Sequence, residues 1–480
     1  MLYTYIILGW LSVVAIFQGV KPLPPGVNYL GDEHFIADSS MEFLVDLTFR
    51  DSLGETQHQQ QIFHTVFSYI DSAQKYILID MFLFNSHKGP AAWSLNELSD
   101  DLSKLLIQKK QSIPDIQIDF ITDPVNTLYG GVKLPELEAM QQAGINTIVS
   151  DLTKLRDSNP LYSPLWRTGF QWLGNTAEYG FLTNIFDGDL PRVTLRSYLA
   201  FLNLKANHRK IFVADCGDEM VSIITSANPH SASADFSNIG MLVKGELWRD
   251  IYDSEMGLAQ FSDSKLSGEF FTRIPPQRVS KETGSSIQLI TEGKIRNALL
   301  HHFEASTTDD TIKIAMFYMS NRKIVKSLLH AADRGVIVRL ILDPNKDGFG
   351  FHHNGTPNRP VVKELLRKSK GQIDIRWFHT HGEQFHSKVS LIKKQEGQHV
   401  VILGSANMTR KNLDNYNLEA NILLQLDRNT DMAEEIDAYL DMLWYNQGEN
   451  YTTDVATFND AGLLKSVLYR IQEFTGLSTY

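Results

Sequence analysis

The sequence has very little cysteine: Cys216 is the single cysteine among 480 residues. No intramolecular disulfide can form, so a secreted scaffold held together by disulfides is excluded. The chain also has no set of Cys and His residues at zinc-binding spacing, which excludes the common structural zinc modules. Because Cys216 follows Asp215 near the end of an expected strand, we interpret it as a structural thiol.

Positive charge is also scarce. The chain has 45 Lys and Arg residues against 56 Asp and Glu residues, which gives a net charge of −11. Broad nucleic-acid binding depends on many basic side chains that neutralise phosphates, so this balance disfavours it. It does not exclude a small phosphodiester held by two local lysines.

Disordered or low-complexity tracts are missing as well, and 43% of the residues are hydrophobic, as in ordinary folded proteins. A chain of 480 residues is too long for one ordinary core. We therefore expect two domains or one duplicated domain.

A compound motif occurs twice, within residues 201–245 and 383–426. In each copy a His-x-Lys triplet opens an apolar run, and Ser-Ala-Asn follows. The two copies contribute matching polar residues: His208, Lys210, Ser226 and Asn228 in the first, and His386, Lys388, Ser405 and Asn407 in the second. The serine follows the histidine by 18 residues in the first copy and by 19 in the second. Such a repeat predicts two copies of one structural unit that bring these residues together.

The order of the expected elements repeats too. In the first half, periodicity predicts a helix at 60–73, a strand at 76–84, a helix at 95–109, a strand at 116–122 and a helix at 134–143. The second half repeats this order with a helix at 295–306, a strand at 311–318, a helix at 322–333, a strand at 336–342 and a helix at 361–369. Each half is therefore expected to be an α/β unit of the βαβ type, with helices covering a sheet.

The N-terminus carries a long apolar run at residues 2–20, which suits one membrane-spanning helix of about 20 residues. A cleaved signal peptide is the alternative, but no basic residue precedes the run and no clear Ala-x-Ala site follows it. A proline-rich spacer comes next. We expect an uncleaved anchor at 1–21 and a linker at 22–45, with the orientation in the membrane left open.

Beyond the linker, we expect a first domain at 46–260, a connector at 261–285 and a second domain at 286–480. An aromatic-rich insert at 151–206 breaks the symmetry of the two halves. Tyr and Trp favour membrane interfaces, so the insert is expected either to lie on lipid, to line an acyl pocket or to pack as a helix on the domain surface.

Two histidines on opposite sides of one phosphorus can cleave a phosphodiester in two displacements. One attacks to form a phosphohistidine, and the other protonates the leaving group and then activates a water or an alcohol. Lys210 and Lys388 lie two positions after each histidine, on the same strand face, and can neutralise the non-bridging oxygens. Asn228 and Asn407 can donate to those oxygens, and the motif serines can bond a histidine ring or the backbone. The lysines supply the positive charge, so no metal is needed.

This pattern resembles the phospholipase D superfamily, whose signature is His-x-Lys-x4-Asp followed by Gly-Ser-x-Asn. His208, Lys210 and Asp215 match the first signature in full, whereas Lys393 stands at the Asp position of the second copy. The resemblance implies two pseudo-symmetric phospholipase D-type βαβ sandwich domains with the active site at their interface, preceded by an N-terminal transmembrane helix. It points to a bacterial, membrane-anchored member of the cardiolipin synthase or phosphatidyltransferase branch.

The resemblance also implies an acid after each motif that orients a catalytic histidine. Glu419 fits this role for the second motif, whereas the first copy offers only Asn238 or Gly240, neither of them acidic. One histidine is therefore expected to lack a carboxylate partner, and His208 is the family-level preference for the nucleophile. The catalytic residues expected on this basis are His208, Lys210, Asn228, His386, Lys388, Asn407 and Glu419, supported by Asp215, Ser226 and Ser405, with no metal ligands.

Three activities share this chemistry: phospholipid hydrolysis, phosphatidyl transfer to an alcohol, and nucleic-acid cleavage. The anchor and the aromatic insert favour a lipid. We expect a metal-independent phosphodiesterase or phosphatidyltransferase that acts on phospholipids through a phosphohistidine, without a cofactor or an obligatory nucleic acid. A monomer suffices for the site, and the expected location is the bacterial inner membrane. The alternatives are a membrane-anchored nuclease of the same superfamily and an inactive, membrane-tethered binding domain.

Overall fold

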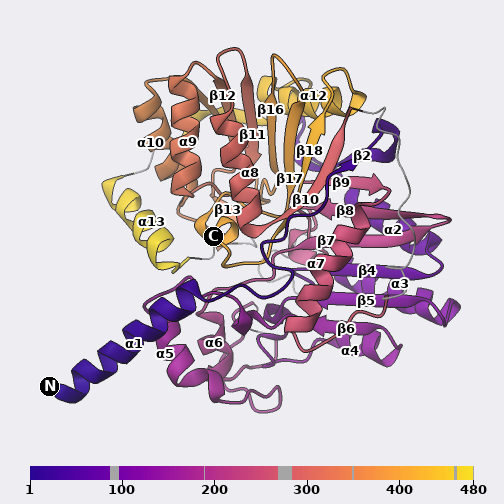
Figure 1. Cartoon of the computed structure of the whole chain (residues 1–480), viewed down its shortest axis with the longest axis vertical. Coiled ribbons are helices and arrows are strands. Elements are labelled where there is room, and N and C mark those ends of the chain that lie inside the picture. The colour runs from indigo at the N-terminus through magenta and orange to yellow at the C-terminus, as the bar shows by residue number, and fades with distance from the viewer. Residues whose placement is uncertain are drawn as a thin grey trace.

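The structure, a computed structural model, describes residues 1–86, 97–186, 188, 190–268, 284–348, 351–458 and 462–478. Most of the expected connector at 261–285 lies outside the described residues, as do the first two residues of the helix expected at 95–109. Within the described part, the chain forms a mixed α/β structure with two large sheets, one of eight strands and one of nine (Figure 1).

The eight-stranded sheet contains β2 (Met41–Arg50), β3 (Thr56–Gln59), β4 (Tyr76–Met81), β5 (Gln117–Thr122), β6 (Asn146–Val149), β7 (Lys210–Cys216), β8 (Glu219–Thr225) and β9 (Asn238–Lys244). The nine-stranded sheet contains β1 (His34–Phe35), β10 (Ser286–Thr291), β11 (Thr311–Met316), β12 (Ile337–Leu342), β15 (Ile373–Phe378), β16 (Lys388–Lys393), β17 (His399–Gly404), β18 (Ala420–Leu426) and β19 (Thr452–Asp454). A separate small ribbon pairs β13 (Asp347–Gly348) with β14 (Phe351–His352).

The α-helices in the described ranges are α1 (Leu2–Val20), α2 (Ile62–Ser72), α3 (Leu98–Ser112), α4 (Pro135–Gln142), α5 (Ser163–Thr168), α6 (Leu195–Phe201), α7 (Leu247–Phe261), α8 (Glu292–Glu304), α9 (Arg322–Asp333), α10 (Asn358–Ser369), α11 (Arg410–Leu413), α12 (Asp431–Tyr445) and α13 (Leu463–Thr475). Short 3₁₀ turns connect several of these elements, at Asp38–Ser40, Pro124–Thr127, Leu152–Lys154, Phe170–Trp172, Ser231–Ser233 and Val455–Phe458.

The two sheets repeat one strand order. The first runs β2-β9-β8-β7-β4-β5-β6 inside its β3 edge, and the second runs β10-β18-β17-β16-β11-β12-β15 inside its β1 and β19 edges. In both sheets the last three strands of this order pair in parallel, and the remaining pairs are antiparallel. The shared order confirms the α/β fold class predicted from the repeated motifs.

Segments with a strong apolar periodicity form the helices and strands that the sequence predicts. The helix predicted at 322–333 is α9, and its N-terminus is capped by Asn321, whose side chain accepts from the backbone N–H groups of Lys323 and Ile324. All six residues of β4 are buried, as expected for a strand covered on both faces. Boundaries differ by a few residues: β4 ends at Met81 instead of continuing to Phe84, and α10 begins at Asn358 instead of Val361.

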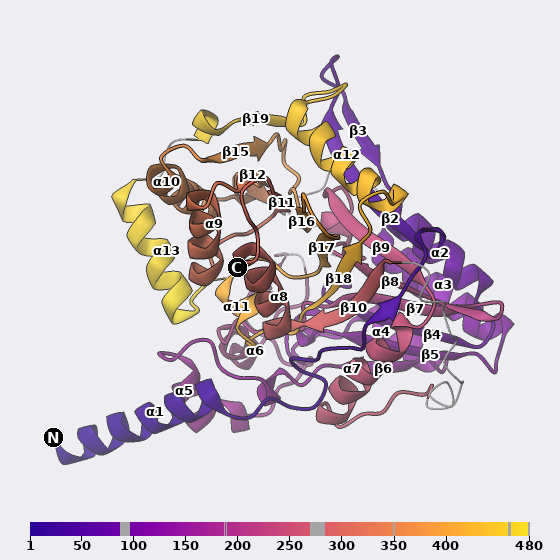
Figure 2. The same cartoon turned by 45° about the horizontal axis from the view of Figure 1, so that its top comes forward.

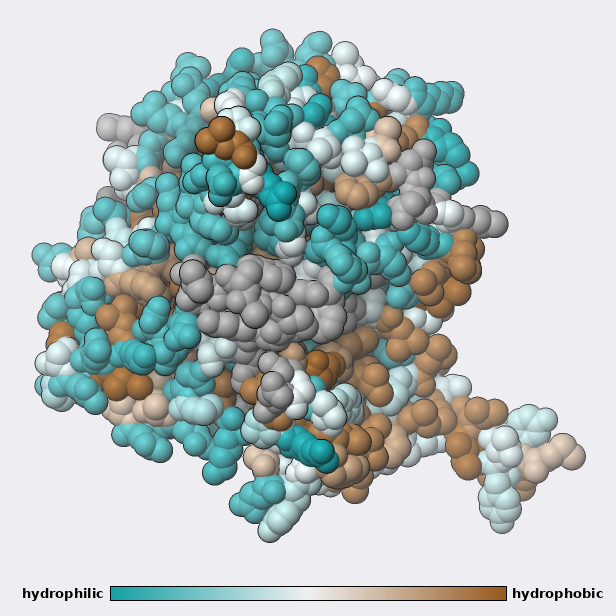
Figure 3. Space-filling model, turned by 180° about the vertical axis from the view of Figure 1, so that it is seen from behind, coloured by the Kyte–Doolittle hydropathy of each residue, from teal (hydrophilic) through white to brown (hydrophobic). Residues whose placement is uncertain are grey.

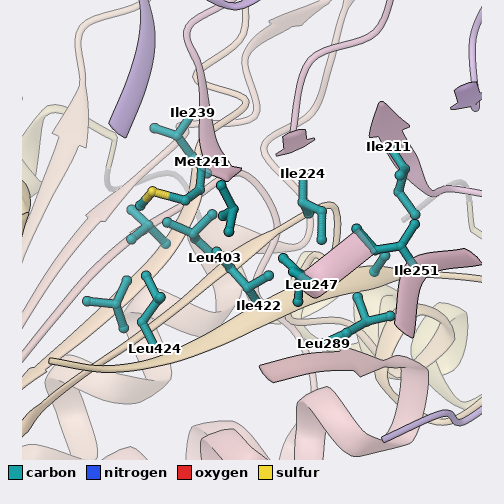
Figure 4. Packing of buried hydrophobic residues seen from close by; sticks show 14 of the residues in the cluster. Ile211, Ile224, Ile239, Met241, Leu247, Ile251, Leu289, Leu403, Ile422 and Leu424 are labelled. Carbon is teal, nitrogen blue, oxygen red and sulfur yellow. The ribbon is translucent and has the colours of Figure 1, made fainter. Parts of the chain in front are cut away.

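A shared apolar core joins the two sheets. Ile239 and Met241 on β9 lie in one cluster with Leu403 on β17 and Ile422 on β18, and α7 adds Leu247 (Figure 4). All five side chains are at most 1% exposed. Burying an aliphatic side chain of this size contributes about 1.5–3 kcal/mol, so this interface holds the two halves in a fixed relation.

The segment expected as a linker, 22–45, contacts both halves. His34 and Phe35 pair with β10 of the second sheet, whereas Met41 already belongs to β2 of the first. Gly26 lies against α7 with a φ of 75°, and a Cβ there would come within 2.4 Å of the carbonyl oxygen of Ser254. Glycine is therefore required where the linker crosses this helix.

Helix α1 protrudes from the body and packs its C-terminal half beside α5 of the insert (Figures 1 and 2). Trp10 Nε1 donates to Thr168 at 3.1 Å, and the N–H of Asp157 donates to the carbonyl oxygen of Gln18 at 3.0 Å. None of its residues is buried, and its length and composition suit a membrane span or a signal sequence. The apolar N-terminal helix predicted from the sequence is thus present, and it rests on the insert.

Arg209, the middle residue of the first His-x-Lys triplet, is fully buried where the two halves meet. Its guanidinium donates to Glu255 on α7 at 2.8 Å and to Glu292 at the start of α8 at 2.9 Å. It also donates to the carbonyl oxygen of Gly26 in the linker at 3.0 Å. One side chain thus connects three segments that are far apart in the sequence.

We predict that Arg209→Met lowers the free energy of unfolding by about 3–5 kcal/mol, because it leaves two buried carboxylates without their cation. Chemical denaturation of the full chain in detergent measures this loss. The matched control is Lys104→Met, which removes an exposed ion pair with Asp100 and should cost about 0–1 kcal/mol. Equal small losses in both variants would contradict the joining role of Arg209.

Candidate active site

The two motif histidines lie two residues before equivalent strands, β7 and β16, and the opposite half fixes the backbone of each. The N–H of His208 donates to the carbonyl oxygen of Leu418 at 2.9 Å, and the N–H of His386 donates to that of Ser237 at 2.8 Å. Both bonds belong to short parallel bridges between the halves. The motifs are thus held together by a reciprocal exchange of hydrogen bonds.

The ring of His208 is held by a carboxylate from the second half. Its Nδ1 atom lies 3.0 Å from the carboxylate of Glu419, which also accepts from Ser405 at 2.5 Å and from the amide of Asn412. An Nδ1–H that donates to this carboxylate leaves the lone pair of the neutral ring on Nε2. The prediction that Glu419 serves the second motif is therefore wrong, because β18 meets the start of β7 across the pseudo-twofold axis.

The ring of His386 has an amide in the equivalent place. Its Nδ1 atom lies 3.0 Å from Oδ1 of Asn238, which also accepts from Ser226 at 3.1 Å. The Nδ2 group of Asn238 donates to the carbonyl oxygen of Phe236 at 3.0 Å, and this bond fixes the amide orientation. His386 is therefore the histidine without a carboxylate partner, and it too presents Nε2 with a lone pair.

The two motif lysines are buried beside the histidines in equivalent positions. Lys210 Nζ donates to the carbonyl oxygen of His208 at 2.8 Å, and Lys388 Nζ donates to that of His386 at 2.8 Å. Burial lowers the pKa of Lys210 to about 7 and lowers the pKa of Lys388 well below its usual value. The positive charge of Lys210 contributes to the lowered pKa of Lys388, and a bound anion would favour the charged form of both lysines, so the site favours an anion.

The motif asparagines are oriented by the backbone. Oδ1 of Asn228 accepts from the N–H of Leu83, and Oδ1 of Asn407 accepts from the N–H of Tyr318, both at 3.3 Å. Both residues line the central cavity. With each amide oxygen engaged by the backbone, the NH₂ groups are the donors left for a ligand.

Burial lowers the pKa of both histidines well below the usual value, and the two lysines add to this effect. Burial raises the pKa of Glu419 to about 7 despite the nearby lysines. Without a ligand, both imidazoles are therefore neutral at neutral pH. A bound phosphodiester anion would offset the lysine charges and raise the pKa of both rings.

A cavity of about 450 Å³ contains both histidines, between the halves. Its wall is mainly apolar, with side chains from both halves and from the insert: Phe82, Leu83, Val125, Tyr129, Ile185, Phe186, Phe201, Leu204, Phe236, Phe317 and Tyr318. The insert thus forms one side of the cavity, as one of the interpretations of its aromatic sequence predicts. Such a wall fits a ligand with an apolar portion next to a phosphate.

The Asp positions of the two motifs are structural and differ in charge. Asp215 accepts from the backbone N–H groups of Lys75 and Tyr76 at 2.9 and 2.8 Å, and so fixes the start of β4. In the second half, Lys393 instead pairs with Asp437 on α12 at 2.5 Å. Lys393 therefore supports its strand through an ion pair to α12, and neither it nor Asp215 is among the residues that line the cavity.

Sequence reasoning missed two lysines of the cavity wall. Lys205 forms a buried ion pair with Asp157, and Lys411 donates to the carbonyl oxygen of Ser478. Burial lowers the pKa of each to about 7. Neither lies in a motif, although Lys411 follows Asn407 by four residues, at the start of α11. Both bring an amino group to the cavity wall.

Comparison with known proteins agrees with this geometry. Residues 299–444 match the family model described as cardiolipin synthase, phospholipase D-like domain. The phosphatidylserine synthase of Haemophilus influenzae has a similar structure, with 10% identity, a TM-score of 0.57, and coverage of 94% of this chain and 96% of that one. No curated protein has a significantly similar sequence.

Two other solved structures share less of the arrangement. One is a phospholipase D family member, Nuc, from Salmonella typhimurium, with 22% identity, a TM-score of 0.28, and coverage of 35% of this chain and 98% of that one. The other is the polyphosphate kinase of Porphyromonas gingivalis, with 11% identity, a TM-score of 0.45, and coverage of 90% and 52%. The family match, the shared fold and the paired His-x-Lys motifs lead to one conclusion: the second half contains a phospholipase D-like domain, and the first half repeats its strand order and its motif.

Proposed function

We propose that the protein is a metal-independent phosphodiesterase or phosphatidyltransferase that acts on phospholipids through a phosphohistidine intermediate. The observation that carries this proposal is the pairing of two neutral imidazoles, each with Nε2 unprotonated, in one mainly apolar cavity flanked by two buried lysines. The phosphate is bound near the histidines, and the acyl chains lie along the apolar wall.

In the first step His208 is the nucleophile, because the carboxylate of Glu419 on its Nδ1 atom stabilises the positive charge that the ring gains as the bond to phosphorus forms. Its Nε2 atom forms a bond to phosphorus as the P–O bond to the head group breaks. The head-group oxygen takes the electron pair and a proton from Nε2 of His386, which the anionic substrate has brought into its protonated form. The products are an alcohol and a phosphatidyl-histidine.

In the second step His386 acts as the base. It removes a proton from water or from a lipid hydroxyl, whose oxygen attacks phosphorus while the P–N bond to His208 breaks. Water gives phosphatidate, and an alcohol gives a new phosphodiester. Through both steps, Lys210 and Lys388 stabilise the negative charge that builds on the non-bridging oxygens, and the NH₂ groups of the motif asparagines donate to those oxygens.

A lipid fits better than a nucleic acid. The cavity wall is mainly apolar, α1 is long and apolar enough for a membrane, and the chain carries a net charge of −11. A nuclease would instead need a basic groove that follows the backbone and aromatic platforms for stacked bases.

We predict that His208→Ala and His386→Ala each reduce phospholipid turnover by at least about 10⁴-fold, since each removes a group that takes part in both steps. Head-group release from mixed phospholipid vesicles measures this. Turnover of the unaltered protein should be the same with and without EDTA. Normal turnover in either histidine variant would refute the assignment.

One assay separates the candidate substrates. The same preparation receives mixed phospholipids and labelled single-stranded DNA, with glycerol or phosphatidylglycerol added in a second series. We expect lipid cleavage, with the transfer product rising as the alcohol rises. Cleavage of DNA alone would support the nuclease, and vesicle binding without any reaction would support the inactive tether.

We predict that Asn238→Asp shifts the basic limb of the pH–rate profile upward by about 1–3 pH units, because a carboxylate 3.0 Å from Nδ1 favours the protonated form of His386. The limb marks the loss of the proton that His386 donates, so raising its pKa extends activity to higher pH. The measurement is kcat against pH.

The matched variant is Glu419→Gln, which gives His208 the amide partner that His386 already has. Removing the carboxylate lowers the pKa of His208, so the acidic limb should move to lower pH while the plateau rate falls. Opposite shifts in the two variants distinguish the nucleophile from the acid. Identical shifts would contradict these roles.

A further inference from the structure

Helix α13 packs its polar side against the second half and exposes its apolar side on the surface. Tyr469 and Glu473 are 1% and 7% exposed, and they face the second half. Glu473 accepts from Ser320 at 2.7 Å, and the hydroxyl of Tyr469 lies 3.2 Å from Glu364. Arg470 also pairs with Glu364, at 2.8 Å. Hydrogen bonds and ion pairs thus hold this helix in place, together with the ring of Tyr469, which belongs to the same apolar cluster as the buried side of α9.

The outer side of α13 is a stripe of large apolar residues at helical spacing. The exposed fractions are 81% for Leu464, 47% for Val467, 52% for Ile471 and 75% for Phe474. A helix on the surface of a globular protein normally buries such an apolar stripe against the core. A contiguous exposed apolar stripe therefore indicates a surface that something else covers.

The stripe continues into the insert. Arg410 on α11 donates to the carbonyl oxygens of Phe474 and of Ser158, at 3.2 and 3.3 Å, so the end of α13 meets the start of the insert. Gly476 lies against Ser158, where a Cβ would come within 2.6 Å of the carbonyl oxygen. The insert in turn supports α1 through Thr168 and Asp157.

The insert exposes its own large apolar side chains, with Leu161 at 64%, Trp172 at 76% and Tyr179 at 76% exposed. Seen from behind, hydrophobic atoms gather on one side of the molecule, over α13 and the insert, toward the protruding α1 (Figure 3). Three separate parts of the chain, α1, the insert and α13, thus form one apolar face.

We propose that this apolar face lies in the interfacial region of a lipid bilayer, with α13 as a second membrane contact in addition to α1. Continuity with α1 identifies the occupant, since a 19-residue apolar helix with none of its residues buried leaves the body at the same face. The outward stripe of α13 and the exposed Trp and Tyr of the insert are the groups that bind at such an interface.

This contact does not depend on the proposed reaction, but it gives that reaction a route for its substrate. Ile185, Phe186 and Phe201 of the insert line the cavity, whereas other parts of the same insert form the apolar face. A lipid that leaves the bilayer at the insert would therefore reach the histidines without crossing water.

Site-directed fluorescence on the full chain tests the contact. In a Cys216→Ser background, Ile471→Cys and Phe474→Cys are labelled with an environment-sensitive dye and reconstituted in phosphatidylcholine–phosphatidylglycerol vesicles with nitroxide lipids. We expect roughly twofold or greater quenching at both positions. The matched control is Leu53→Cys, an 85% exposed leucine in the β2–β3 hairpin on the side away from α1, which should stay unquenched (Figures 1 and 2).

Two outcomes would overturn the proposal. One is a label on α13 that is no more quenched than the label at residue 53. The other is a shielded, unquenched label together with an oxidative cross-link between unlabelled Ile471→Cys copies, which would show that a second copy covers the stripe. Because quenching needs no turnover, a failed membrane contact is distinguishable from a failed enzymatic assignment.

A functional variant complements this test. Replacing Leu464, Ile471 and Phe474 together by Ser should raise KM for vesicle phospholipid severalfold and leave kcat/KM for a soluble short-chain phosphodiester unchanged. An unchanged KM for vesicle phospholipid would contradict the proposal that α13 helps the enzyme to reach its substrate at the membrane. A loss on both substrates would mean that α13 supports the catalytic body and would contradict a purely membrane role.

Discussion

The candidate site depends on an exchange of partners across the pseudo-twofold axis. Each histidine lies two residues before a strand of its own half, but the other half supplies both its backbone acceptor and the group on its Nδ1 atom. Neither half alone can orient its own imidazole. The apolar core between β9, β17 and β18 and the buried Arg209 network are therefore conditions for the chemistry as well as for stability. A small shift between the sheets would move the two rings apart.

The exchange is symmetric in geometry and asymmetric in charge. Glu419 and Asn238 occupy equivalent strand positions, accept from equivalent serines and lie at the same 3.0 Å from their rings. One is a carboxylate and the other is a neutral amide. Because a nearby negative charge favours the protonated imidazole, the duplicated fold gives its two histidines different basicities. A difference of this kind can divide the roles of nucleophile and acid between two otherwise similar residues.

The sequence was sufficient for the duplication and for its main elements, because apolar periodicity and the spacing of the His-x-Lys motifs are local patterns. It left Asn238 and Gly240 as two candidates for the counterpart of Glu419, and the fold has Asn238 there. It placed Glu419 with the second motif, whereas the carboxylate contacts His208 of the first. The contact between Glu419 and His208 joins the two halves of the chain. No local sequence pattern predicts which segment of one half contacts which segment of the other. For the same reason Asn412, Lys205 and Lys411 escaped notice, since only the folded chain brings them to the cavity. The outward stripe of α13 has a helical pattern, yet the direction it faces is decided by Glu364 and Ser320, which lie over a hundred residues away.

The central claim is that the substrate phosphate is bonded covalently to one of the two histidines during the reaction. Rapid quenching of the full chain with a phospholipid labelled at phosphorus, followed by mapping of alkali-stable labelled peptides, measures this directly. We predict that the label appears on His208 during turnover and disappears when substrate is exhausted. Label on His386, or steady turnover with no label on either histidine, would contradict the claim.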